Sequence, residues 1–256
     1  TFRTPAAEES IRIMAEQFPD MLLGAGTVLT TEQADRAIAA GAKFIVSPGF
    51  NPKVVSHCIE KNIPITPGIS SPSDMEQAIE MGLDAVKFFP AVPSGGLSMI
   101  KALAAPYHTM RFMPTGGVTP QNLTEFLDYP KILACGGTWM VKPELLATGN
   151  FEEITRLTRQ TVRTMLDLKI DELTLPFPHT GNNLSDALHG LINLSSGSTK
   201  ELTISCRYLK RTIYHLEKNG ATFRYDNAKY DSAGNMNAID FSDAPEDFSI
   251  RLIEKH

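Results

Sequence analysis

The stretch IPITPGISSPSDMEQAIEMGLDAVKFFPA, residues 63–91, contains an apolar run, an amphipathic helical pattern and a second apolar run. Ser71 precedes the helical pattern and can cap it, and Gly82 follows it. A helix between two β-prone runs predicts parallel strands joined by a crossover. The second run contains Lys87 between two apolar residues, where an unpaired ammonium is unfavourable. The stretch therefore predicts a βαβ unit that carries an unusual lysine.

The same unit recurs from residue 21 to about residue 169. Strands that alternate with helices fit either a doubly wound sheet or a (β/α)8 barrel. Barrel sites are assembled from all the strand ends on one face, whereas an open sheet concentrates its site at one switch point. Six runs end in similar small or polar residues, which favours an α/β TIM barrel. These ends are Gly26-Thr27, Ser47-Pro48-Gly49, Pro67-Gly68, Phe89-Pro90, Thr115-Gly116-Gly117 and Gly136-Gly137-Thr138.

The N-terminal residues supply only part of a further unit. Residues 5–19, PAAEESIRIMAEQFP, have apolar residues at helical spacing, and the preceding TFRT looks like the tail of a strand. Six full strands do not close an eight-stranded barrel. We therefore expect this chain to be a barrel that lacks its first βα unit, as a fragment of a longer protein would.

The pattern changes after a predicted helix that ends near residue 169. Residues 170–200 are rich in loop-formers and predict a linker between the barrel, residues 1–169, and a C-terminal domain. Residues 201–256 alternate in a way that predicts a small α+β unit of the order βαβββ. Such a unit is marginal as a free-standing core, so we expect it to dock on another surface or to pair with another copy.

Composition excludes several classes of function. The chain has 24 Lys and Arg against 29 Asp and Glu, so a broad basic surface for nucleic acid is excluded. No apolar run approaches the roughly 20 residues of a membrane span. The three cysteines have no metal-ligand spacing, which favours reduced thiols in a cytoplasmic protein.

Lys87 is the first candidate for chemistry. With a period of two, Ala85, Lys87 and Phe89 share one face of their strand, which in a barrel is the lumen near its mouth. A lysine here either extends its ammonium out of an edge strand or has a depressed pKa and attacks carbonyl groups. Helical patterns on both sides predict a central strand, which favours the nucleophile.

Other strand ends suggest what the lysine attacks. Arg3 and Thr27 end the first two strands, and a guanidinium with a hydroxyl suits a small carboxylate. Glycine pairs at the last two strand ends suit a phosphate, because only glycine lets backbone N–H groups approach it closely. The candidate phosphate residues are Thr115, Gly116, Gly117 and Thr138. Together these side chains predict a site for a phosphorylated 2-oxo acid.

Residues 1–169 resemble the 2-keto-3-deoxy-6-phosphogluconate / 4-hydroxy-2-oxoglutarate aldolase family. The resemblance rests on residues 63–91 together with GAGTVLT (24–30), FIVSPGFNP (44–52), RFMPTGGVTPQNL (111–123) and ACGGTWM (134–140). It implies a class I aldolase on a (β/α)8 barrel, with no metal or organic cofactor, and often a homotrimer. It also implies that Lys87 forms the Schiff base, that Arg3 and Thr27 bind the carboxylate, and that the four residues named above bind the phosphate.

The expected reaction is cleavage of 2-keto-3-deoxy-6-phosphogluconate into pyruvate and glyceraldehyde 3-phosphate. Two alternatives stay open: cleavage of unphosphorylated 4-hydroxy-2-oxoglutarate, or a non-catalytic barrel that binds a phosphorylated ligand. The resemblance places a general acid/base glutamate two residues before Thr1, outside this sequence. We therefore expect the chain to keep the nucleophile and to lack the base.

The C-terminal unit resembles half of a vicinal-oxygen-chelate, or glyoxalase-like, module. The resemblance directs attention to possible metal ligands on strands. The candidates are His179, His189, His215 and Glu254. They show no ligand spacing, so we expect a structural unit with no metal site.

Overall fold

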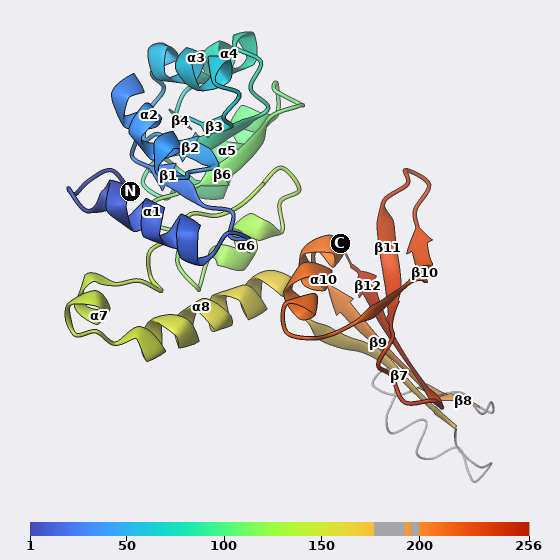
Figure 1. Cartoon of the computed structure of the whole chain (residues 1–256). Coiled ribbons are helices and arrows are strands. Elements are labelled where there is room, and N and C mark those ends of the chain that lie inside the picture. Colours follow the sequence, from blue (N-terminus) through green and yellow to red (C-terminus); the bar gives the residue numbers. More distant parts are fainter. Residues whose placement is uncertain (177–192, 196–199, 256) are drawn as a thin grey trace. The chain divides into compact units, whose positions relative to one another are not determined.

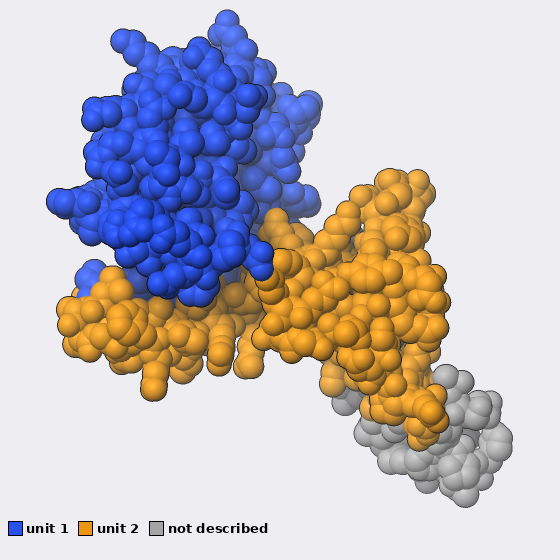
Figure 2. All heavy atoms as spheres, in the orientation of Figure 1, with its two compact units in different colours: residues 1–143 blue, residues 144–256 orange. Residues whose placement is uncertain are grey.

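The computed structural model describes residues 1–176, 193–195 and 200–255, drawn in Figure 1. The chain divides into two compact units, Thr1–Pro143 (unit 1) and Glu144–His256 (unit 2), which Figure 2 colours separately. The division falls after Pro143, whereas the sequence predicts a boundary at residue 169. The predicted last helix of the barrel therefore belongs to unit 2.

Unit 1 contains short parallel strands with helices between them. The strands are β1 (Gly24–Gly26), β2 (Phe44–Val46), β3 (Ile65–Thr66), β4 (Gly68–Ile69), β5 (Ala85–Phe88) and β6 (Arg111–Pro114). The helices are α1 (Ala7–Gln17), α2 (Thr31–Ala39), α3 (Pro52–Glu60), α4 (Pro72–Glu80), α5 (Gly96–Ala104) and α6 (Leu123–Leu127). This alternation is the one that the sequence predicts.

The strands of unit 1 pair in the order of the chain. One sheet has the order β1-β2-β3 and a second has the order β4-β5-β6, with every pair parallel. Pro67 separates β3 from β4 within one run, and its carbonyl accepts a 2.8 Å hydrogen bond from Lys87 N. A doubly wound sheet reverses its strand order at a switch point, and this order has no reversal. Sequential pairing is the arrangement of a barrel wall.

Two predicted strands are not regular strands in the structure. The run after Lys131 makes only two isolated parallel bridges, Phe112 to Ile132 and Thr115 to Gly136. Adjacent glycines weaken a strand, which accounts for the interruption near Gly136. The TFRT stretch forms turns, although Phe2 N donates to Gly26 O at 2.8 Å and so places it beside β1.

Local sequence fixes where the helices of unit 1 begin. Thr30 Oγ1 accepts from Gln33 N at the start of α2, and Ser71 forms a capping box with Asp74 at the start of α4. Each cap satisfies a backbone donor that has no partner within the helix. The helices therefore begin directly after the strand ends, and this keeps those ends on one face.

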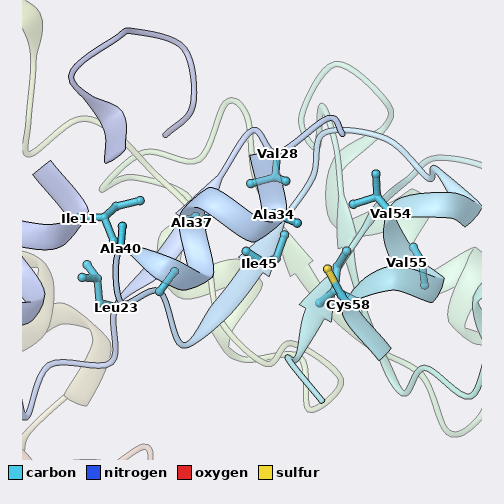
Figure 3. Packing of buried hydrophobic residues seen from close by; sticks show 13 residues of the cluster. Ile11, Leu23, Val28, Ala34, Ala37, Ala40, Ile45, Val54, Val55 and Cys58 are labelled. Atoms are coloured by element: carbon cyan, nitrogen blue, oxygen red, sulfur yellow. The ribbon is translucent and has the colours of Figure 1, made fainter. Parts of the chain in front are cut away.

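The core of unit 1 lies between the helices and the first strands. Ile11 of α1, Ala37 of α2 and Ile45 of β2 belong to one cluster of buried residues, and Figure 3 shows Ile11 next to Ala40 of that cluster. Val54 and Cys58 of α3 belong to the same cluster, and both are almost fully buried. Small alanines on α2 let that helix approach the strands closely. The packing holds the strands from outside and leaves their other face for the site.

Unit 2 is built on a six-stranded sheet in the order β10-β11-β12-β9-β7-β8. Its elements are α7 (Pro143–Ala147), α8 (Phe151–Leu166), β7 (Lys169–Pro176), β8 (Asn193–Ser195), β9 (Lys200–Cys206), α10 (Leu209–Glu217), β10 (Phe223–Tyr230), β11 (Met236–Phe241) and β12 (Phe248–Glu254). Strand β8 and all of β7 except Lys169 fall within residues 170–200, which the sequence predicts to be a linker. A register shift between Ile170 and Glu172 breaks the alternation there, so period two does not reveal β7.

A small core holds the sheet of unit 2 to α10. The cluster consists of Cys206, Leu209, Ile213, Phe223, Ile239 and Leu252. Among the helices of the described residues, none is long and apolar enough to cross a membrane.

Candidate active site

Lys87 lies on β5 with its side chain buried and only 8% exposed. It stands opposite Gly68 of β4 and Met113 of β6 in the parallel register. Val86 and Phe88, which flank it in the chain, point to the other face and are fully buried. Lys87 is therefore on a central strand, on the inner face of the wall, as its position in the sequence predicts.

The surroundings of Lys87 favour the neutral amine. Burial lowers the pKa of its ammonium below the ordinary value of 10.5, and the charge of Arg3 lowers it further. The nitrogen lies over the ring of Phe89, 4.5 Å from the ring centroid, and this contact opposes the two effects because an aromatic face attracts a cation. Burial removes water from the ammonium, and a like charge disfavours it, so both effects make the nitrogen a better nucleophile.

Arg3 and Thr27 lie on neighbouring segments. The hydrogen bond from Phe2 N to Gly26 O brings these two stretches of chain together. Thr27 has a backbone φ of 58°, in the left-handed region that a β-branched residue rarely adopts. Such strain persists only where the surroundings impose it, and it is concentrated at functional sites. The structure thus places Thr27 directly after β1 and brings the turn that contains Arg3 beside that strand.

The loop after β6 is shaped by its glycines. Gly116 and Gly117 have φ angles of 93° and 84°, and a Cβ at Gly117 would lie 2.6 Å from Val92 Cβ. Asn122 Nδ2 donates to Gly117 O at 3.1 Å, and Val92 N donates to Gly116 O at 3.0 Å. Only glycine fits both positions without strain. The loop is therefore fixed in a conformation that keeps its backbone uncovered by side chains of its own.

The two threonines of the predicted phosphate site occupy different environments. Thr115 follows β6, is half-buried and forms the parallel bridge with Gly136. A Cβ at Gly136 would lie 2.5 Å from Thr115 Oγ1, so the two strand ends are in close contact. Thr138 lies two residues beyond that bridge and is exposed. The structure joins Thr115 to the neighbouring strand end and leaves Thr138 on the surface of the same loop region.

Phe89 and Gly68 belong to the site, but the sequence analysis assigns no role to either residue. Period two already places Phe89 on the face of Lys87, and this was the available signal. Gly68 is packed against backbone, because a Cβ there would lie 2.0 Å from Pro48 O. That contact joins residues that are distant in sequence, and no local pattern reports it.

The metal candidates of unit 2 have structural partners or lie outside the described residues. His179 and His189 belong to residues that the structure does not describe. His215 lies on α10 with its ring against Tyr214, and Glu254 Oε2 accepts from Leu209 N at 2.7 Å. Within the described ranges, no three His, Cys, Asp or Glu side chains gather in a way that would hold a metal ion.

Comparison with known proteins gives a consistent result for unit 1 and the residues that follow it. The chain is 53% identical over 163 residues to a 2-dehydro-3-deoxy-phosphogluconate aldolase of Treponema pallidum, covering 64% of this chain and 78% of the relative. It is 50% identical to the Haemophilus influenzae protein of the same name, covering 63% of this chain and 76% of that protein.

Solved structures agree with these relatives. A KDPG aldolase from Legionella pneumophila, with pyruvate captured at low pH as a covalent carbinolamine, superposes with a TM-score of 0.60. It is 36% identical and covers 64% of this chain and 77% of its own. The fold of unit 1 is accordingly α/β and of the TIM-barrel type. The sequence profile of KDPG and KHG aldolases matches residues 1–157, and the chain belongs to that aldolase family.

Proposed function

We propose that the protein is a class I aldolase that cleaves 2-keto-3-deoxy-6-phosphogluconate to pyruvate and glyceraldehyde 3-phosphate. The observation that carries the proposal is Lys87, which is a buried lysine on a central strand with a lowered pKa. A buried lysine without a structural ion pair is the form in which lysine acts as a nucleophile. The similarity to aldolases of 50% and 53% identity supports the same reaction.

The mechanism begins at the nitrogen of Lys87. The neutral amine attacks the C2 ketone of the substrate, and loss of water gives an iminium. The iminium withdraws electrons from the C3–C4 bond, which breaks to release glyceraldehyde 3-phosphate and leave the enamine of pyruvate. Protonation and hydrolysis then free pyruvate. The covalent carbinolamine of pyruvate in the Legionella pneumophila enzyme supports this route.

Two further groups of residues position the substrate in this proposal. Arg3 and Thr27 bind the carboxylate next to the ketone, since a guanidinium and a hydroxyl donate to both of its oxygens. Thr115, Gly116, Gly117 and Thr138 bind the phosphate at the other end. The left-handed conformations of Gly116 and Gly117 support this role, because a backbone without side chains lets an anion approach its N–H groups closely.

The test is reductive trapping. Borohydride added with pyruvate should fix a stable adduct on Lys87, found by mass spectrometry of its peptide, and a purely binding barrel gives no adduct. Cleavage rates for 2-keto-3-deoxy-6-phosphogluconate and for 4-hydroxy-2-oxoglutarate then separate the two aldolase reactions. Trapping of pyruvate reports the nucleophile directly, so it is the decisive measurement for the proposed Schiff base.

Thr138 offers a clean test of the phosphate end. Thr138→Glu should weaken apparent affinity for the phosphorylated substrate about 10-fold, because a carboxylate repels the phosphate. Pyruvate trapping should not change. The exposed position tolerates the substitution, whereas any side chain at Gly116 would strain a backbone with φ of 93°.

Thr138→Gln is the matched control, since it has the shape of glutamate without the charge. Steady-state kinetics with the phosphorylated substrate and trapping with pyruvate report the two ends separately. Equal losses with both ligands, or equal effects of Glu and Gln, would place the phosphate elsewhere.

The assembly and location are proposed on other observations. We infer a homo-oligomer, with the trimer implied by the resemblance, because Leu22 and Phe18 of unit 1 are 77% and 53% exposed. Light scattering of the purified chain measures the number of copies. No disulfide joins the cysteines, all three of which the structure describes, and this supports a cytoplasmic location.

Unit 2 is proposed to be structural, with the strand–helix–strand–strand–strand order of Lys200–Glu254 supporting a glyoxalase-like half-module. Its charged groups pair with one another: Arg251 Nε lies 2.8 Å from Asp240 Oδ1, and Arg251 Nη1 lies 3.2 Å from Glu201 Oε1. Glu254 caps the start of α10. Side chains engaged in this way stabilise the sheet rather than present a reactive group.

A further inference from the structure

The ring of Phe89 lies against the nitrogen that performs the chemistry. Lys87 Nζ is 4.5 Å from the ring centroid, within the distance at which an aromatic face attracts a cation. Phe89 follows directly after β5, which ends at Phe88, and it shares the face of Lys87. A desolvated cation gains more from such a ring than an exposed one does. The burial of Lys87 therefore increases the stabilisation that the ring gives to a positive charge on its nitrogen.

The ring is held in place by the loop after β6. A Cβ at Gly116 would lie 3.3 Å from Phe89 Cε2 and 3.3 Å from Pro90 Cα. The ring of Phe89 therefore packs against the α-carbon of Gly116, where a side chain would leave too little space. Ala91 N donates to Thr115 O at 2.8 Å, and this bond fastens the chain after the ring to the same loop. The position of the ring is thus set by backbone rather than by a flexible side chain.

The ring of Phe89 is the favourable partner that the described residues offer to a positive charge on Lys87. Among the residues that the structure describes, no carboxylate forms an ion pair with Lys87, and the charged side chain whose field acts on it is Arg3. Arg3 remains protonated at every pH of interest and repels a cation. The aromatic face is therefore the group in contact with Nζ that favours a positive charge.

We propose that the ring of Phe89 is a catalytic group that stabilises the positive charge on Lys87 Nζ both in the ammonium and in the iminium formed with a 2-oxo acid. The inference rests on the proposed Schiff-base function. In the net reaction the C–O double bond of the ketone breaks, a C–N double bond forms, and the oxygen leaves as water with two protons of the ammonium. One positive charge is present before and after, and it stays on the same nitrogen beside the ring.

This charge balance gives a signature that depends on pH. Well below the pKa of Lys87, the ring stabilises the starting ammonium and the product iminium alike, so weakening the ring leaves the affinity for pyruvate unchanged. Above that pKa the starting amine is neutral and only the iminium gains from the ring. There, weakening the ring lowers the equilibrium constant for adduct formation. A ring that merely filled space would affect adduct formation equally at every pH.

The experiment replaces Phe89 in the whole chain by fluorinated phenylalanines, which keep the shape of the ring while progressively removing its attraction for a cation. Pyruvate affinity is measured by borohydride trapping across a pH series. Full fluorination should lower affinity about 5- to 30-fold above the pKa of Lys87 and leave it unchanged well below that pKa. Fluorination also removes the attraction of the ring for the ammonium, which lowers the pKa of Lys87. The pH at which trapping reaches half its maximal rate should therefore move lower.

Phe89→Leu extends the series with a natural residue. Leucine should reproduce the loss above the pKa, because it has no aromatic face to attract the cation. An equal loss at all pH values across the fluorinated series, or no loss at all, would overturn the proposal. Failure of the unaltered chain to form any pyruvate adduct would instead reject the Schiff-base function itself.

Discussion

Replacement of Lys87 by methionine is expected to abolish the borohydride-trapped adduct with pyruvate and to lower aldol cleavage by on the order of 10⁴- to 10⁶-fold. Methionine has a similar length and no nucleophilic nitrogen, so the iminium cannot form. Lys101→Met is the matched control, because Lys101 lies on α5 and its ammonium is over the ring of Tyr129, 5.6 Å from the centroid. It should keep full trapping. A Lys87→Met chain that still yields a pyruvate adduct would assign the nucleophile to another lysine.

The same substitution should raise stability. Burial lowers the pKa of Lys87 in the folded chain, so the unfolded chain holds the proton more tightly. The folded state therefore bears its full penalty below the folded pKa, and the penalty fades as the pH rises toward the ordinary value of 10.5. Methionine removes the penalty. Thermal melts should show that Lys87→Met is more stable than the unaltered chain at neutral pH, and that this difference declines toward pH 10.5. A residue that lowers the stability of the fold in this way is typical of a functional site.

Gly68→Ala is expected to destabilise unit 1 by about 3 kcal/mol or more, or to prevent its folding. A Cβ at Gly68 would lie 2.0 Å from Pro48 O and 2.8 Å from Gly49 N, and both are backbone atoms that cannot rotate away. Gly68 also stands opposite Lys87, so any shift of β4 would move the nucleophile. The variant chain should unfold at lower denaturant concentration and lose pyruvate trapping together.

Gly49→Ala is the control for that change. Its Cβ would meet nothing within 4 Å, although Gly49 lies in the same contact with Gly68. Its midpoint of urea unfolding should match that of the unaltered chain. If the Gly68→Ala chain were as stable as the Gly49→Ala chain, the conclusion that β4 packs closely against the backbone of Pro48 would be wrong.

Much of unit 1 could be predicted from local patterns. The caps at Thr30 and Ser71 locate helix starts because a side-chain acceptor satisfies a backbone donor only there. Period two is enough to put Lys87 and Phe89 on one face, and the cation–π contact between them confirms that placement. Such patterns depend only on neighbours in the chain, which is why the sequence reveals them.

Other features depend on contacts between distant residues, and the sequence does not reveal them. The packing of Gly116 against Phe89 and of Gly68 against Pro48 exists only once the strands are assembled. Strand β7 was predicted to be linker because a bulge after Ile170 shifts its alternation by one residue. The roles of Arg3 and Thr27 remain predictions, to be tested by their effect on pyruvate affinity.

The sequential pairing of strands in unit 1 has a consequence for how the protein is made. Within each of the two sheets a strand pairs with the one that follows it in the chain, so each pairing closes a loop of only one connecting helix. A ribosome releases residues in that same order. β1 and β2 can therefore associate before β5 has been synthesised, and the inner face of the wall is assembled from the N-terminal side as the chain grows.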